Sequence, residues 1–137
     1  MSTAELLDII GGLTSLIKSY AAKLPAVVHL NAVPSGVKPS PETVDHYETV
    51  VSRARTQSAG TSFKGLNDSF VTSLEAFENG HLLGAIQPLL SVLDHVERMH
   101  SEKEIEVGRA DGQRLREYRA ALRKVLPGNR PELDNPT

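Results

Sequence analysis

Two Glu-x-x-His pairs are the residues in this chain whose types and spacing could bind a metal ion. They are Glu78 with His81 and Glu97 with His100. On a helix, this spacing places both side chains on one face, as in carboxylate-bridged di-iron bundles. The first pair spans Asn79-Gly80, a sequence typical of a helix end, so it loses that geometry. Glu97 and His100 remain as metal-ligand candidates, and carboxylates from other helices would have to complete the site.

Arginines recur every seven residues in the last third of the chain, at positions 109, 116, 123 and 130, with Arg119 on the same flank. The segment before them, 94–106, is acidic, with five acids and two bases. One interpretation is an antiparallel helix pair whose flanking charges meet, as at the edges of coiled coils. The other is a partner-binding surface formed by Arg116, Arg119 and Arg123, which would attract phosphate or an acidic partner.

No motif in the sequence predicts an enzyme. The chain has no Gly-x-Ser-x-Gly nucleophile elbow, and no glycine loop followed by Lys-Ser or Lys-Thr that would bind phosphates. It has no cysteine, which excludes a cysteine nucleophile, a thiolate zinc site and a disulfide framework. Five histidines are present, but their spacing selects none of them for acid–base chemistry. We therefore expect a protein that is not an enzyme and has no cofactor.

Composition narrows the remaining functions. The formal net charge of −2 argues against a globally basic nucleic-acid binder, so nucleic-acid binding would depend on the basic last helix alone. Apolar residues make up 39% and charged residues 23%, as in soluble globular proteins. No apolar run approaches the roughly 18 residues of a transmembrane helix, and no basic region followed by an apolar run predicts a signal peptide. We expect a soluble, cytoplasmic protein without a transmembrane segment.

Apolar residues at steps of three and four predict an all-α fold. We expect helices at 3–23, 41–56, 62–79, 81–104 and 111–126, packed as a four- to five-helix bundle. The stretch from 82 to 99 is the most apolar and periodic, so its helix is expected at the centre. Its predicted buried stripe comprises Leu82, Ile86, Leu89, Leu93, Val96 and His100.

Several residues predict how the helices begin, end or bend. Ser2 or Thr3 is expected to cap the first helix and Asp111 the last. Pro88 predicts a kink or a break in the fourth helix. Gly11-Gly12 interrupts the first helix; we favour a tolerated weak point or slight bend over a close approach of another backbone.

The predicted organisation is one domain over residues 1–128, followed by a flexible tail at 129–137. A long Pro-rich crossover at 25–41 connects the first two helices. The apolar seams of the first and fourth helices are broad, and a small monomer would have difficulty covering both, which predicts a homo-oligomer. The function predicted is therefore a non-enzymatic interaction or assembly module, binding a protein partner or itself. The alternatives are a carboxylate–histidine metal bundle and nucleic-acid binding through the last helix.

Overall fold

The computed structural model describes residues 1–22 and 39–125, which form five α-helices and contain no strand. This confirms the predicted all-α helical bundle. The helices are α1 (Thr3–Ala21), α2 (Pro41–Ser58), α3 (Asn67–Glu78), α4 (Leu82–Ser101) and α5 (Arg109–Val125), with a short 3₁₀ turn, η1 (Lys64–Leu66), before α3. Most of the predicted crossover at 25–41 and all of the predicted tail at 129–137 lie outside the described residues.

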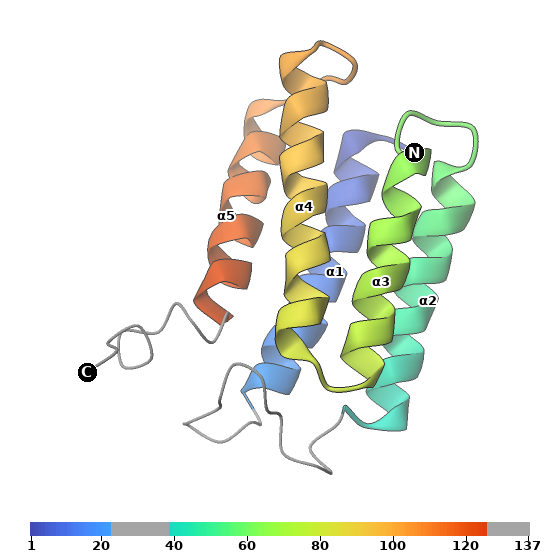
Figure 1. Ribbon diagram of the computed structural model, residues 1–137. Helices are drawn as coiled ribbons and strands as arrows, with labels where there is room; N and C mark the ends of the chain where they lie inside the picture. Colours follow the sequence, from blue (N-terminus) through green and yellow to red (C-terminus); the bar gives the residue numbers. More distant parts are fainter. Residues whose placement is uncertain (23–38, 126–137) are drawn as a thin grey trace.

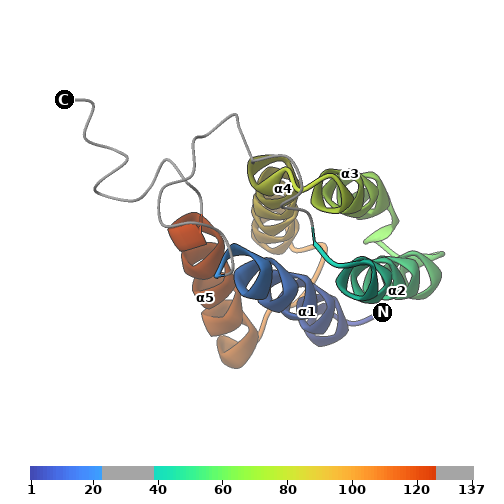
Figure 2. The same cartoon turned by 90° about the horizontal axis from the view of Figure 1, so that it is seen from below.

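Helices α1 to α4 alternate in direction and form an antiparallel four-helix bundle (Figure 1). Seen along the bundle, α1, α2, α3 and α4 surround a common core, and α5 lies outside it against α1 and α4 (Figure 2). Helix α5 therefore runs parallel to α1 and antiparallel to α4. None of the described helices is long and apolar enough to cross a bilayer.

The helix ends follow from local hydrogen bonding. Ser2 caps α1, as expected: its hydroxyl accepts the Glu5 amide at 3.1 Å, and the Glu5 carboxylate accepts the Ser2 amide at 2.9 Å. Ser40 caps α2 through its hydroxyl, which accepts the Thr43 amide at 3.2 Å, and Pro41 stands at the first helical position. Gly80 has a φ of +74°, a conformation that glycine adopts without strain and that ends α3 before α4 begins.

Three details of the predicted helices are wrong. Helix α3 begins at Asn67, because residues 64–66 form the 3₁₀ turn first, and the prediction began it at 62. Helix α5 begins at Arg109, so Asp111 lies in its first turn and is not its cap. The predicted break at Pro88 is absent: Pro88 lies inside one continuous helix, since the proline removes only one backbone hydrogen bond and buried side chains on both sides of it hold α4 in place.

The buried stripe of α4 ends at Met99 and not at His100, which is exposed. The periodicity assumes neighbouring helices along the whole length of α4, but its last turn extends beyond the ends of α1 and α3 (Figure 1). There His100 lines a shallow surface hollow beside the loop to α5. The other predicted members of the stripe are buried: Leu82, Ile86, Leu89, Leu93 and Val96.

The apolar seams of α1 and α4 are both covered within a single chain. Helix α1 buries side chains on two sides, because α5 covers the flank that the other three helices leave open (Figure 2). Its fully buried side chains are Leu6, Leu7, Ile9, Ile10, Leu13 and Ile17. The prediction of self-association rested on these seams being left uncovered, and it loses that basis.

One polar chain runs through the core. The Tyr47 hydroxyl is 2.5 Å from the Ser73 hydroxyl, which donates to the Ala85 carbonyl at 2.6 Å. Both hydroxyls are buried, so each needs this partner. Burial raises the pKa of Tyr47 well above the usual value for tyrosine. The Tyr47 ring stacks on Phe77 at 4.3 Å between ring centroids, which fixes α2 against α3.

Candidate functional site

Helix α5 is held to the bundle by few apolar contacts. Among the described residues of α5, only Leu115 and Leu122 are buried to the level of the core. Tyr118, Ala121 and Val125 are half-buried beside them. The rest of its contact with α1 and α4 comes from polar side chains, which distinguishes α5 from the other helices of the bundle.

The Tyr118 side chain of α5 packs directly against Gly11 of α1. A Cβ atom at position 11 would lie 2.5 Å from the Tyr118 hydroxyl oxygen and 2.8 Å from the adjacent ring carbon, closer than such atoms come in proteins. Gly12 has no such neighbour; its nearest contact would be Val50 at 3.9 Å. The sequence offered two interpretations of Gly11, a tolerated weak point and a close approach of another backbone. The structure shows neither, because Gly11 is the site against which an aromatic side chain packs.

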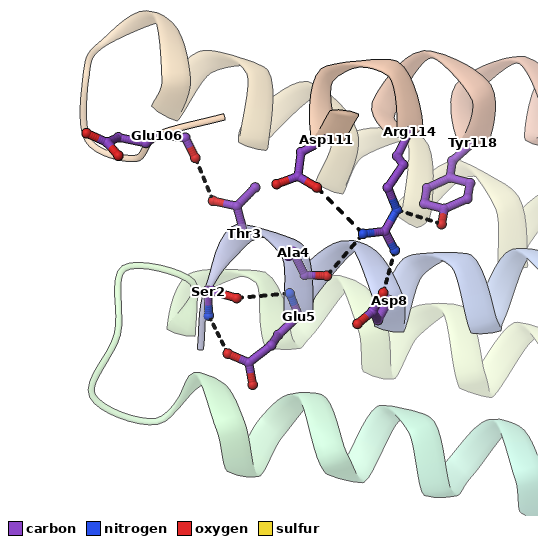
Figure 3. Close-up of polar contacts among 9 residues, drawn as sticks. All are labelled: Ser2, Thr3, Ala4, Glu5, Asp8, Glu106, Asp111, Arg114 and Tyr118. Carbon is purple, nitrogen blue, oxygen red and sulfur yellow. Dashed lines mark hydrogen bonds and ion pairs between the residues drawn. The ribbon is translucent and has the colours of Figure 1, made fainter. Parts of the chain in front are cut away.

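Arg114 attaches α5 to the start of α1 (Figure 3). Its guanidinium lies 2.5 Å from the Asp8 carboxylate and donates to the Ala4 carbonyl at 3.4 Å. It also donates to the Tyr118 hydroxyl at 3.2 Å, and Asp111 lies 3.6 Å away. Partial burial alone would lower the pKa of Arg114, but the hydrogen bonds to Tyr118 and Asp8 raise it above the usual value. This arginine therefore stays charged and positions the tyrosine on Gly11.

Arg119 attaches the other flank of α5 to α4. Its guanidinium lies 2.6 Å from a carboxylate oxygen of Asp94 and 2.9 Å from one of Glu97. The Arg119 side chain is only 18% exposed. For this residue, the interpretation of charges that meet across an antiparallel helix pair is confirmed. Arg119 thus lies in the α4–α5 contact, apart from the exposed side chains of Arg116 and Arg123 with which the sequence grouped it.

The outward surface of α5 carries the remaining positive charge. We call Arg109, Arg116, Arg123 and Lys124, which are all exposed, the basic face of α5. Six basic and two acidic residues give α5 a net charge of +4. Because the whole chain has a formal net charge of −2, the residues outside α5 carry −6. Glu117 is the one acid exposed on this surface, and Gln113 donates to it at 3.2 Å. The basic face is therefore a local excess of positive charge on an otherwise acidic protein.

The metal candidates do not come together with further ligands. Glu97 forms the ion pair with Arg119, and His100 is exposed at the end of α4. Within residues 1–22 and 39–125, no group of three or more His, Asp or Glu side chains is arranged to hold a metal ion. The Glu78–His81 pair is separated by the end of α3, as the sequence indicated.

Sequence reasoning missed the contacts that hold α5. Arg114 falls outside the seven-residue repeat, and its partner Asp8 is 106 positions away along the chain. Tyr118 lies more than 100 positions from Gly11 along the chain, and no sequence pattern connects the two residues. The arginine repeat predicted Arg116 and Arg123 of the basic face as partner-binding residues. Arg109 belongs to the same repeat but was not among the predicted residues.

Comparison of the chain with models of protein families, with curated proteins and with solved structures found no match in any of the three.

Proposed function

We propose that this protein is a non-enzymatic interaction module that binds an acidic, helical protein partner through the basic face of α5. The observation that carries the proposal is the division of the α5 charges. The two arginines that point toward the bundle, Arg114 and Arg119, are paired with carboxylates of α1 and α4. Those of the basic face remain exposed, with a single acid beside them.

The spacing of the basic face suits a helical partner. Arg109, Arg116 and Arg123 are seven residues apart, which places successive guanidinium groups about 10 Å apart along one side of α5. A second helix with carboxylates every seven residues would present its charges at the same interval. Ala110 and Ala120 are also exposed on α5, and such short side chains allow a neighbouring helix to approach.

The attachment of α5 supports the same proposal. Tyr118 on Gly11, together with the ion pairs of Arg114 and Arg119, fixes the rotation of α5 about its own axis. The basic face is therefore presented in one orientation before a partner arrives, and preorganisation of this kind reduces the entropy lost on binding.

The test uses a synthetic helical peptide with glutamate at every seventh position, added to ¹⁵N-labelled protein and followed by NMR. We expect chemical-shift changes confined to α5 and the adjacent surface of α4, and their loss in the Arg116→Glu variant. Arg53→Glu is the matched control, because Arg53 is exposed on α2 and makes no ion pair with a described residue. Shift changes centred on another helix, or equal binding by both variants, would contradict the proposal.

Nucleic acid is the competing ligand for the same charges. A DNA duplex that bound α5 more tightly than the peptide, with a steep loss of affinity on addition of salt, would replace the proposed protein partner. We expect the peptide to bind more tightly, because the −6 charge on the rest of the chain repels an extended polyanion more than a short acidic helix.

A further inference from the structure

A pair of exposed cations, Arg55 and Lys64, lies where α2 ends and α3 begins; α2 and α3 are on the side of the bundle opposite α5 (Figure 2). The pair lines a surface hollow of about 460 Å³. The hollow is formed by Ser52, Arg55, Thr56 and Ala59 of α2 and its end, Lys64 of η1, and Asn67, the first residue of α3. We call it the Arg55–Lys64 hollow.

The lining of this hollow offers hydrogen-bond donors and no carboxylate. Arg55 and Lys64 are exposed, and neither forms an ion pair with any described residue. The hydroxyls of Ser52 and Thr56, on the same face of α2, make no hydrogen bond within the described part of the chain. Two cationic side chains and two hydroxyls therefore line one hollow, and no carboxylate of the described residues forms an ion pair with either cation.

Asn67 adds an oriented donor. The buried Ser58 hydroxyl donates to the Asn67 side-chain oxygen at 3.1 Å. Because the oxygen of this amide is occupied, its NH₂ group is left as a donor at the lining of the hollow. The Ser58 hydroxyl oxygen also lies 3.4 Å from the Arg55 carbonyl oxygen, so the same hydroxyl contacts the end of α2 and the start of α3.

We propose that the Arg55–Lys64 hollow binds a phosphate group, either the free ion or the terminal phosphate of a phosphomonoester. A phosphate carries a charge of about −1.5 to −2 near neutral pH and has three or more acceptor oxygens. Two cations match that charge, and an arginine guanidinium can donate to two phosphate oxygens at once. The hydroxyls and the amide of Asn67 can donate to the remaining oxygens. The site is independent of the basic face of α5, so either proposal can fail without the other.

The experiment is an NMR titration of the full-length ¹⁵N-labelled protein with inorganic phosphate, with ionic strength held constant by sodium chloride. We expect saturable shifts of the Asn67 side-chain NH₂ and of backbone amides between 52 and 67. Arg55→Gln and Lys64→Gln should each weaken binding about tenfold, the order expected when one charge-assisted hydrogen bond is lost. Arg53→Gln removes the same charge from the same helix outside the hollow, and its affinity should equal that of the unaltered protein.

Both cations are exposed and unpaired, so these variants should fold normally, and unchanged spectra elsewhere in the protein would verify it. A parallel titration with O-phosphoserine separates the two sources of the phosphate group: tighter binding than inorganic phosphate identifies a phosphomonoester, and equal binding identifies the ion. The proposal is overturned if shifts do not saturate, if chloride alone produces them, or if Arg53→Gln weakens binding as much as Arg55→Gln.

Discussion

Replacing Gly11 with alanine tests how closely α5 is seated on α1. A helix interior gains roughly 1 kcal/mol when glycine becomes alanine, and Gly12→Ala should show this gain because its new methyl group meets nothing closer than 3.9 Å. At Gly11 the same methyl group would lie 2.5 Å from the Tyr118 hydroxyl oxygen, so the tyrosine has to move. Overpacking of this kind costs about 1–3 kcal/mol. We therefore expect Gly11→Ala to be less stable than Gly12→Ala by about 1–3 kcal/mol.

The assay is urea unfolding of both variants, monitored by circular dichroism, with equal slopes required for the comparison. Repeating it in a Tyr118→Ala background completes a double-mutant cycle, and the difference between the two glycine sites should disappear there because nothing remains for the new methyl group to displace. If Gly11→Ala were as stabilising as Gly12→Ala, Tyr118 would not pack against Gly11, and this contact would not attach α5 to α1.

Three further predictions concern the core and the second attachment of α5. Ser73→Ala should lower the free energy of unfolding by about 1–3 kcal/mol in urea, because the buried Tyr47 hydroxyl loses its partner; Tyr47→Phe should cost less, since Ser73 still donates to the Ala85 carbonyl. Burial raises the pKa of Tyr47 in the folded protein, so on raising the pH the unfolded chain ionises first; the contribution of Tyr47 to stability is therefore fully present below about pH 10 and is lost above it. Between pH 9 and 11, the free energy of unfolding should fall more steeply than in Tyr47→Phe, by up to about 1.4 kcal/mol per pH unit. Equal slopes for the two proteins would contradict this. Arg119→Gln should lower the free energy of unfolding by about 1 kcal/mol or less at low salt, because the two acidic partners of Arg119 are 59% and 49% exposed. The loss should be smaller at high sodium chloride concentration, and a loss independent of salt would show that the ion pairs are not its source.

The helical fold could be predicted because the periodicity of buried residues is a local property of the sequence. The stripe from Leu82 to Val96 followed from spacing alone, and residue type limited the cap of α1 to Ser2 or Thr3. The prediction failed where tertiary neighbours decide the outcome. His100 is exposed because α4 extends past the ends of α1 and α3 beside it, and Pro88 stays inside α4 because its packed neighbours outweigh one missing hydrogen bond.

The candidate site was predictable only in part, for the same reason. The seven-residue arginine repeat indicated a charged flank, but sequence could not divide it into residues that pair with the bundle and residues that face outward. That division depends on where Asp94 and Glu97 of α4 lie relative to Arg119. The seat of Tyr118 on Gly11 joins residues more than 100 positions apart, and no local pattern connects them.

The most direct test of the proposed function is the affinity of the glutamate-repeat peptide, labelled with a fluorophore, measured by anisotropy. We predict measurable binding to the unaltered protein, at least about tenfold weaker binding to the Arg116→Glu/Arg123→Glu variant, and weaker binding as sodium chloride is raised. Equal affinity for the two proteins, at any salt concentration, would contradict the assignment of the basic face of α5 as the interaction surface.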